Sequence, residues 1–459
     1  MESLSVYFIN PPSYENRRLI RNFDCATESK GYYIYQPYDF LVLSSYFEKK
    51  EFNFIDAIAQ NLKSEEVIKK VKKPDLIFLA MVDTNWQEDL SFLKKIYKKF
   101  PEARIFVFGD SFIEEYSRQE VNPYITAILI NPFELTRDEF IGKKEIQSMG
   151  FYHEGAYTKH DLKKKNKVKM APAQHESFFH PSYRWPFTRH KKYTSVFVSW
   201  GCPYSCSYCV VAKFPNLHRE ASEVIDELRR IKKMGVKEIY FADRSFGVPL
   251  TEVKKILETM IIEKMNFSWS AYFHPNQFSK SLLELMKKSG CHTIITGIES
   301  KNQNELKKYG RNIQGQKLSE LLDFSKKVKI DVCGDFILGL PGQTKKDILE
   351  TIHYAIKLDL DYASFNIATP LPGSSLRRDA LRDGRLRAGE DKNYDSFGYN
   401  KVLSNDFLTG DEIKRLRNYA VSRFYMRPKY WLKRLLKIRS FEHLFIQIQE
   451  MLYLVIKNR

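Results

Sequence analysis

Residues Trp200-Gly-Cys-Pro-Tyr-Ser-Cys-Ser-Tyr-Cys209 decide how this chain of 459 residues is interpreted. They follow directly on an apolar, strand-like run and space Cys202, Cys206 and Cys209 as Cys-x-x-x-Cys-x-x-Cys. Three thiolates on one tight loop can each hold one iron of a four-iron, four-sulfur cluster and leave the fourth iron open to a ligand. Zinc is the alternative, but structural zinc sites close four ligands, and the local candidate for a fourth is His218. Pro, Tyr and Ser between the cysteines indicate an exposed loop rather than a buried core.

The chain around and after the cysteine loop alternates strand-like runs with helix-length segments. This alternation predicts parallel strands joined by helices, with chemistry at the carboxyl end of each strand. The strand-end residues here include Asp243, His274, Glu299-Ser300 and Gly339-Leu-Pro-Gly342. The six predicted strands are Thr194–Ser199, Glu238–Ala242, Phe267–Tyr272, Thr293–Gly297, Ile330–Leu338 and Tyr362–Ala368.

The cysteine loop, with Tyr208 before its last cysteine, resembles the cluster loop of the radical S-adenosylmethionine (SAM) superfamily. The resemblance implies an incomplete, six-stranded (β/α) barrel that carries a 4Fe-4S cluster. It also implies that SAM binds the open iron and that electron delivery cleaves it to a 5′-deoxyadenosyl radical. A flavodoxin or ferredoxin is then expected as the electron donor.

Further segments resemble SAM-binding motifs of this superfamily. Thr296–Ser300 looks like the Gly-x-Glu-Ser segment that ends the fourth strand, and Arg311 looks like the arginine that approaches the SAM carboxylate. Gly334–Gly342 looks like the glycine segment along the adenosine. Alternatively, Glu299 forms a buried ion pair and Arg311 is a solvated helix residue. The cofactor contacts implied by the resemblance are Tyr208, Asp243, Glu299, Ser300, Arg311 and Gly339, and no catalytic residue is singled out.

The N-terminal third alternates short apolar runs with amphipathic helical segments, which predicts a doubly wound parallel sheet. Ligands of such sheets bind at the carboxyl ends of the strands, here beginning with Asn10-Pro11-Pro12. None of these turns is a glycine-rich phosphate loop, so a dinucleotide is not favoured. The predicted strands are Val6–Ile9, Phe52–Ile55, Leu76–Ala80, Ile105–Phe108 and Ile125–Ile130.

The order of the parts also resembles one branch of the superfamily. A doubly wound domain over 1–149, a linker over 150–192, a barrel over 193–380 and a basic helical region over 381–459 are similar to the cobalamin-binding branch. That branch includes methyltransferases acting on carbon or phosphorus and the anaerobic cyclase of chlorophyll biosynthesis.

The resemblance to this branch implies cobalamin in the N-terminal domain. Asn10 is expected near it, and Trp86 either covers the cobalt face or merely begins a helix. No Asp-x-His-x-x-Gly segment would supply a lower histidine ligand. Gly109-Asp110 replaces the paired glycines that relatives usually have, so a degenerate domain without cobalamin stays open.

Charge and cysteine content restrict the partners and the compartment. The formal net charge is +18, and residues 411–459 hold 12 Lys and Arg against 4 Asp and Glu. A basic nucleic-acid-binding protein is the alternative from another class, but it leaves the cysteine loop unexplained and no repeated aromatic ladder supports it. Six cysteines indicate a reducing compartment, and no apolar stretch approaches the roughly 20 residues that span a bilayer. A cytoplasmic protein is expected.

The C-terminal region predicts a basic amphipathic surface. Apolar residues repeat at three and four spacing beyond Ser440, from Leu444 to Val455. This stripe either packs on the barrel or contacts a membrane periphery, and the latter would suit an amphiphilic or lipid-derived small-molecule substrate. The sequence therefore predicts a radical SAM enzyme that functionalises an unactivated carbon, with cobalamin and methyl transfer or a related reaction. The alternative is a cobalamin-independent oxidation or rearrangement.

Overall fold

The computed structural model describes residues 4–21, 29, 33–113, 119–129, 136–146, 151–153, 156–158, 166–387, 394–438 and 441–457. The chain forms two compact units. Unit 1 comprises Met1–Ser29 and Ile34–Tyr183, and unit 2 comprises Lys30–Tyr33 and Arg184–Arg459.

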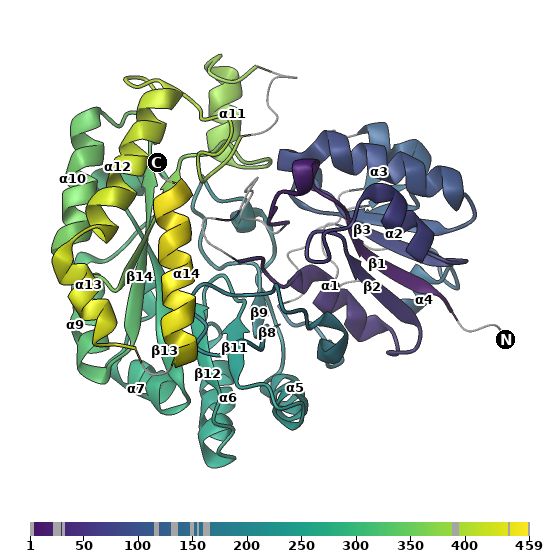
Figure 1. Cartoon of the computed structure of the whole chain (residues 1–459), viewed down its shortest axis with the longest axis horizontal. Coiled ribbons are helices and arrows are strands. Elements are labelled where there is room, and N and C mark those ends of the chain that lie inside the picture. Colours follow the sequence, from purple (N-terminus) through teal and green to yellow (C-terminus); the bar gives the residue numbers. More distant parts are fainter. Residues whose placement is uncertain are drawn as a thin grey trace. The chain divides into compact units, whose positions relative to one another are not determined.

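Unit 1 is built on a five-stranded parallel sheet with the strand order β2-β1-β3-β4-β5 (Figure 1). Strand β2 lies on one side of β1, and β3, β4 and β5 follow on the other side. Helices therefore cover both faces of the sheet, and the predicted doubly wound fold is confirmed. The strands are β1 (Val6–Asn10), β2 (Phe52–Asp56), β3 (Leu76–Ala80), β4 (Arg104–Phe108) and β5 (Ala127–Leu129).

Alternate residues of these strands form two separate cores, as strands buried on both faces require. Ile9 and Ile77 pack with α2 (Ser64–Lys70) and α3 (Trp86–Lys99) on one face. Phe8 and Phe78 pack with α1 (Tyr38–Leu43) and α4 (Arg137–Phe140) on the other.

The segment predicted as a linker, 150–192, is divided in the structure. Strands β6 (Phe151–His153) and β7 (Ala156–Thr158) form an antiparallel pair. Phe178 lies over Phe54 with ring centroids 4.5 Å apart, and the Tyr183 hydroxyl donates to Asp56 at 2.5 Å. Phe178 and Tyr183 are therefore buried parts of unit 1, and the main segment of unit 2 begins at Arg184.

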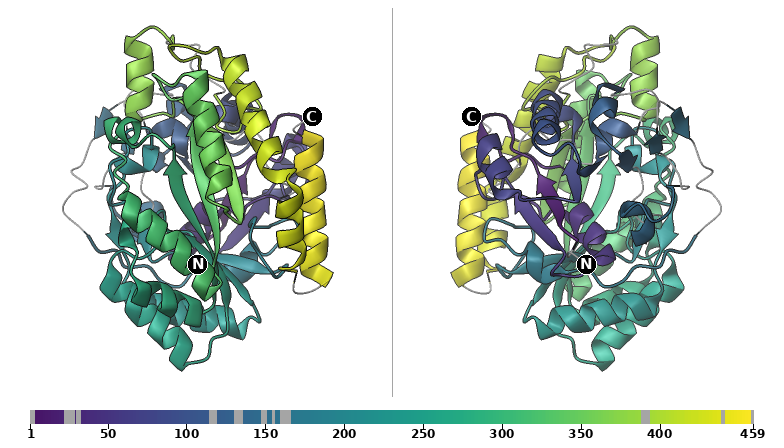
Figure 2. Two further views of the ribbon diagram at one scale, coloured as in Figure 1. Left: turned by 90° about the vertical axis from the view of Figure 1, so that its left-hand side faces the viewer. Right: turned by 90° about the vertical axis from the view of Figure 1, so that its right-hand side faces the viewer.

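Unit 2 is built on a six-stranded, all-parallel sheet with the order β8-β11-β12-β13-β14-β15 (Figures 1 and 2). The six predicted strands all occur. Among the described residues β8 and β15 do not pair with each other, so the barrel is incomplete, as expected. The strands are β8 (Tyr193–Val196), β11 (Glu238–Phe241), β12 (Ser268–Tyr272), β13 (Cys291–Glu299), β14 (Asp331–Leu338) and β15 (Tyr362–Ile367).

Amphipathic helices connect these strands and carry most of their buried residues on one side. The described helices between and after the strands are α5 (Ala221–Lys233), α6 (Leu250–Ile262), α7 (Lys280–Lys288), α8 (Gln303–Lys308), α9 (Gly315–Val328), α10 (Lys345–Lys357) and α11 (Ser375–Arg382). The first predicted strand is interrupted, because β8 ends at Val196 and Ser199–Trp200 forms β9, which pairs antiparallel with β10 (Leu217–His218).

Three C-terminal helices complete unit 2: α12 (Gly410–Tyr425), α13 (Pro428–Leu435) and α14 (Phe441–Lys457). The Tyr425 hydroxyl fixes α12 to β15 by donating to the carbonyl of Ala363 at 2.8 Å and accepting from its amide at 3.1 Å. Within the described chain no helix combines the length and the apolar character that crossing a bilayer requires.

Candidate active site

The cysteine loop begins where β9 ends and is fixed at several points in unit 2. Gly201 has φ +80°, and a Cβ there would lie 2.2 Å from the Pro215 carbonyl oxygen, so only glycine fits the turn. The Ser207 amide donates to Tyr309 after α8 at 2.8 Å, and the Ser207 carbonyl accepts from Ser375 of α11 at 2.8 Å. The loop is therefore held from two sides.

The three thiols of this loop are free of disulfides. Burial raises the pKa of Cys202 and raises that of Cys209 to about 11, so binding of a metal would have to displace protons. In the described part of the chain no three His, Cys, Asp or Glu side chains are placed to hold a single metal ion. In a four-iron, four-sulfur cluster each thiolate would bind an iron of its own, so the three thiols need not converge on one ion.

Arg311 connects the cysteine loop to the carboxyl end of β13. Its Nη1 lies 4.0 Å from the Cys206 sulfur, and its Nη2 donates to the Gly297 carbonyl at 2.5 Å and lies 3.6 Å from Glu299. Burial raises the pKa of Glu299, and the nearby guanidinium opposes that shift. Of the two alternatives that the sequence left open, the buried ion pair of Glu299 occurs in the structure. The solvated position of Arg311 does not occur, because Arg311 is buried.

The surroundings of this ion pair contain polar atoms that a ligand could bind. A Cβ on Gly297 would lie 2.1 Å from Glu299 Oε1 and 2.7 Å from Arg311 Nη2, so glycine is required for the pair to lie across the strand. Among the described residues Thr296 Oγ1 and Arg311 Nε are buried without a hydrogen-bond partner. Such atoms are costly unless something satisfies them. A bound SAM carboxylate and amino group would fit them.

Tyr208, in the cysteine loop, lies near Glu299. Its ring packs beside Leu340 and Tyr309, with ring centroids of the two tyrosines 6.2 Å apart. Burial and the neighbouring Glu299 raise the pKa of its hydroxyl well above the usual value. Tyr208 therefore stays protonated beside the carboxylate.

Asp243, at the end of β11, is fully buried and interacts with the chain just before the cysteine loop. It accepts hydrogen bonds from the Val198 amide at 3.0 Å and from the amide and hydroxyl of Ser199 at 2.6 Å each. Burial raises its pKa to about 6 despite these bonds. Both oxygens are engaged by the chain itself, so Asp243 sets the course of β8 into β9 rather than facing an open space.

Ser300 and Gly339 belong to one buried hydrogen-bond chain. Ser300 donates to Glu305 at 3.0 Å, and Glu305 accepts from Gln343 at 3.1 Å. Gln343 in turn accepts from the amides of Gly339 at 2.7 Å and Leu340 at 3.0 Å. This chain ties the carboxyl ends of β13 and β14 together and shapes the Gly-Leu-Pro-Gly turn.

Tyr204 and Gln343 are residues that the sequence did not assign to the site, whereas His274 was predicted as a strand-end residue. Tyr204, inside the cysteine loop, stacks on His274 at the end of β12 with ring centroids 3.7 Å apart. Burial, aided by Arg311, lowers the pKa of His274 to about 3, so its ring is neutral. Gln343 directly follows the glycine turn. The sequence could have indicated Gln343 only by its position directly after Gly339-Leu-Pro-Gly342.

In unit 1, Asn10 ends β1 and donates to Asp56 of β2 at 2.9 Å. Asp56 also accepts from Tyr183 and from the amides of Ile58 and Ala59, and burial raises its pKa. The Asn10 Oδ1 atom remains buried without a partner in the described chain. Tyr183 was not expected here, because the sequence placed it in the linker.

A buried ion pair lies at the carboxyl ends of β1 and β3. Arg21 Nη1 is 2.5 Å from Asp89, and its Nη2 donates to the carbonyls of Pro11 and Pro12 at 3.1 Å each. Asp89 also accepts from the Val82 amide at 3.0 Å. Near this pair, Thr84 Oγ1 is buried without a partner among the described residues.

Trp86 is the first residue of α3 and is 1% exposed. Its indole NH donates to Glu120 at 2.7 Å, and its ring packs edge-on against Phe112. Trp86 thus begins α3 with its indole buried within unit 1.

Comparison with known proteins places this geometry in a family. The model of the radical SAM superfamily matches residues 196–355. An uncharacterized methyltransferase of Pyrococcus horikoshii, PH0819, is 30% identical over 86% of this chain and 88% of its own length. The chain belongs to the radical SAM superfamily. Its membership explains why the cysteine loop, the Glu299 segment and Arg311 meet at one sheet edge.

Solved structures of this superfamily share the fold over most of the chain. The methyltransferase TsrM from Kitasatospora setae, solved with cobalamin and a [4Fe-4S] cluster, has a TM-score of 0.63 at 15% identity and covers 84% of this chain and 76% of its own. The cobalamin-dependent enzyme OxsB, solved with aqua-cobalamin and SAM, has a TM-score of 0.61 at 16% identity and covers 99% and 72%. The predicted combination of a doubly wound domain, a radical SAM barrel and C-terminal helices is thereby confirmed.

Proposed function

We propose that this radical SAM enzyme binds a 4Fe-4S cluster through Cys202, Cys206 and Cys209, binds SAM beside it, and binds a corrinoid at the strand ends of unit 1. Its reaction is then methyl transfer to an unactivated carbon of a small molecule. The observation that carries the proposal is the meeting of three free thiols with the Arg311–Glu299 pair at the carboxyl end of one parallel sheet.

When bound, the cluster supplies the electron that cleaves SAM, and the corrinoid supplies methyl transfer. The protein's own contribution is positioning. Arg311 offers a carboxylate a fixed positive charge and an Nε that has no partner among the described residues, and Gly297 has no side chain that would clash with the Arg311–Glu299 pair. Asp243 and Gln343 act through the backbone: Asp243 fixes the entry into the cysteine loop, and Gln343 fixes the turn after β14.

The strand ends of unit 1 support the corrinoid part of the proposal. Asn10 Oδ1, at the end of β1, and Thr84 Oγ1, in the segment after the neighbouring strand β3, are buried acceptors without partners among the described residues. Corrinoids carry amide side chains that donate hydrogen bonds to such atoms. The position also fits the rule that ligands bind at the point where the strand order reverses.

A cobalamin-independent reaction is the second candidate, and one observation favours it. The Arg21–Asp89 pair and its bonds to Pro11 and Pro12 already occupy part of the strand-end surface with the protein's own groups. A domain closed in this way serves as a scaffold.

The identity of the other participants also belongs to the proposal. A flavodoxin or ferredoxin delivers the electron, and the substrate is a small, amphiphilic or lipid-derived molecule. The basic C-terminal region, with 12 Lys and Arg against 4 Asp and Glu in residues 411–459, supports contact with an anionic membrane periphery.

Anaerobic turnover with SAM that carries a deuterated methyl group tests the proposal. Purified protein with reconstituted iron, sulfide and a strong reductant should release 5′-deoxyadenosine, whereas protein without iron should not. The same protein should retain cobalt after hydroxocobalamin is added and the sample is desalted. Release of 5′-deoxyadenosine without retained cobalt would support the cobalamin-independent candidate, and no release at all would contradict the proposal.

A further inference from the structure

A cavity of about 460 Å³ lies in unit 2 at the amino ends of β13, β14 and β15, the opposite end of the sheet from the cysteine loop. Its lining includes Thr293 near the start of β13, Asp331 at the start of β14 and Tyr362 at the start of β15. Helix α13, the residues directly after it and the start of α14 close one side with Lys433, Lys437 and His443, respectively. This cavity has no role in the proposed reaction.

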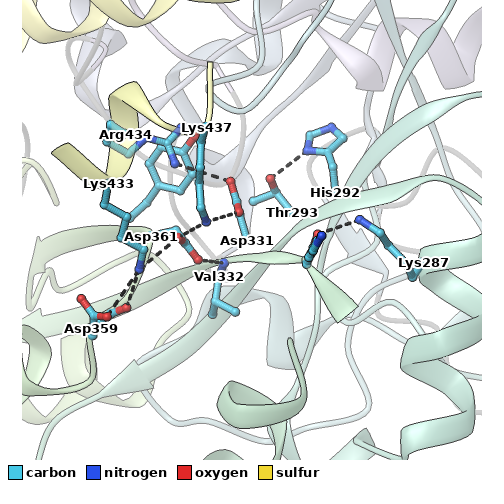
Figure 3. Close-up of polar contacts among 12 residues, drawn as sticks. Lys287, His292, Thr293, Asp331, Val332, Asp359, Asp361, Lys433, Arg434 and Lys437 are labelled. Carbon is cyan, nitrogen blue, oxygen red and sulfur yellow. Dashed lines mark hydrogen bonds and ion pairs between the residues drawn. The ribbon is translucent and has the colours of Figure 1, made fainter. Parts of the chain in front are cut away.

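The acidic side chains of the cavity are already neutralised (Figure 3). Lys437 Nζ lies 2.6 Å from Asp331 and 2.5 Å from Asp361, and Lys433 Nζ lies 3.2 Å from Asp361 and 3.7 Å from Asp359. Arg434 reaches Asp331 at 3.5 Å and also donates to the Tyr362 hydroxyl. These bonds fasten α13 to the sheet.

The lining nevertheless holds a surplus of positive charge. Five cationic side chains face three carboxylates. Lys326 and Lys329, at the end of α9, are exposed and have no ion-pair partner in the described part of the chain. The cavity therefore favours an anion over a cation or a neutral molecule. Its cationic groups are Arg189, Lys326, Lys329, Lys433 and Lys437.

The rim of the cavity is apolar and exposed to solvent. Leu436 lines the cavity and is 80% exposed, and Leu432, Leu435 and Phe441 beside it in sequence are also exposed. Of the fourteen large hydrophobic side chains described as exposed, eight lie between Tyr419 and Ile448. A concentration of this kind indicates an interaction surface rather than chance exposure.

Helix α14 continues this apolar surface. The sequence predicted one apolar stripe, but the structure divides the apolar residues between two faces. His443 and Ile446 are buried, whereas Phe441, Phe445 and Ile448, spaced by four and three residues, are exposed. Helix α14 lies on the outside of unit 2 in both views of Figure 2. One face thus packs on the barrel and the other stays without a partner within the described chain.

We propose that α13, the start of α14 and the adjoining cavity form a docking site for an anionic lipid bilayer, with a lipid phosphate in the cavity and the exposed leucines and phenylalanines in the interface. The charge surplus and the apolar rim together select this occupant, because basic and apolar groups side by side match the headgroup and acyl regions of a lipid. The surface lies away from the carboxyl ends of the strands, so docking leaves the candidate active site accessible. This docking site rests on the membrane contact of the proposed function and specifies the surface that makes it; flotation measures it without turnover, so its failure is separate from a failure of SAM cleavage.

Flotation of the full-length protein with vesicles tests the site. Wild-type protein should float with phosphatidylcholine vesicles that contain phosphatidylglycerol at low salt, and should stay in solution with pure phosphatidylcholine. The double variant Lys326→Glu, Lys329→Glu should partition at least about 30-fold less, since each lysine near an anionic surface contributes about 1 kcal/mol. The variant Leu435→Ser, Leu436→Ser should also lose flotation, and neither exchange touches a buried side chain.

Matched exchanges on other faces of unit 2 serve as controls. Lys254→Glu with Lys280→Glu changes the same number of exposed lysines on α6 and α7, and Ile262→Ser removes an aliphatic side chain that is 77% exposed. These variants should float like wild type. Equal flotation of rim and control variants, or none of the wild type with anionic vesicles, would overturn the proposal.

Two further outcomes would assign the surface to another occupant and overturn the proposal as well. Sedimentation that shows a wild-type dimer lost in the Leu435→Ser, Leu436→Ser variant would assign the apolar rim to a second copy of the chain. Saturable binding of inorganic phosphate that depends on Lys326 and Lys329, without any flotation, would assign the cavity to a free anion. The iron content of each variant after reconstitution reports whether unit 2 is folded.

Discussion

Both units place polar residues at the carboxyl ends of a parallel sheet, but the two sets of strand ends differ in what they leave free. In unit 2 the ends present three thiols, a buried arginine and a partnerless threonine hydroxyl. In unit 1 the ends are joined by Arg21–Asp89 and by Asp56 with its four partners, and Asn10 Oδ1 and Thr84 Oγ1 are buried acceptors without a partner in the described part of the chain. The chemistry of unit 2 can therefore be inferred from the side chains at its strand ends. The ligand of unit 1 has to be inferred mainly from the strand order of its sheet.

The largest expected effect concerns the thiols of unit 2. Exchange of Cys202, Cys206 or Cys209 for Ala should lower iron retention after reconstitution and reduce 5′-deoxyadenosine formation to the level of iron-free protein, because each thiolate holds its own iron. Cys291→Ala, a buried thiol at the start of β13, is the matched control and should keep both properties. Full iron content in a variant of Cys202, Cys206 or Cys209 would show that these thiols do not hold the iron, and unit 2 would then not differ from unit 1 in this respect.

The second effect concerns the stability of unit 1. Arg21→Met should lower the free energy of unfolding by about 3–5 kcal/mol, because it leaves the Asp89 carboxylate buried and unpaired. The double variant Arg21→Met, Asp89→Leu should lose less, since no charge is then left alone. The stability loss of each variant is measured by urea denaturation, with limited proteolysis of unit 1 as the readout of unfolding. A double variant as unstable as the sum of the single ones would show that the pair is not an isolated, self-compensating unit.

A smaller effect is expected for SAM binding in unit 2. Arg311→Lys keeps the charge but loses the planar fork that reaches Cys206, Gly297 and Glu299 at once. The Kd for SAM should rise about 10- to 100-fold by equilibrium dialysis, as expected for the loss of a charge-assisted bond worth about 1.5–3 kcal/mol, with the iron content unchanged. Lys307→Ala, at an exposed position of α8, should leave the Kd as in wild type.

The smallest effect would reveal the ligand of unit 1. Thr84→Val removes a hydroxyl that has no partner in the described chain, so stability should change little. If the hydroxyl contacts a corrinoid, the Kd for hydroxocobalamin should rise about fivefold, the equivalent of one ordinary hydrogen bond of about 1 kcal/mol. An unchanged Kd for hydroxocobalamin would mean that the Thr84 hydroxyl contacts no corrinoid. The strand ends of unit 1 would then differ from those of unit 2 in ligand binding as well.

The sequence predicted the strands well because both sheets are buried on two faces, which produces continuous apolar runs such as Leu76–Ala80. It predicted the cysteine loop because the chemistry of the site lies within ten consecutive residues. The break between β8 and β9 was not predictable, since it follows from Asp243, which comes more than forty residues later and accepts bonds from Val198 and Ser199.

Contacts between distant segments also explain the other differences. Tyr183 was assigned to a linker because its partner, Asp56, is far away in sequence. The sequence could not show that Trp86, a candidate cobalamin cap, is buried at the start of α3 with its indole donating to Glu120, which lies 34 residues later. The ion pairs of Lys437 with Asp331 and Asp361 could not be anticipated from a basic tail alone, because they depend on how α13 packs on the barrel.

The most direct test of the account is the joint iron and cobalt content of one anaerobic sample, reconstituted with iron, sulfide and hydroxocobalamin and then desalted. The account predicts about four irons per chain together with one cobalt, and loss of the iron alone in the Cys206→Ala variant. Retained cobalt with no iron in wild-type protein, or iron content unaffected by the Cys206 exchange, would contradict it.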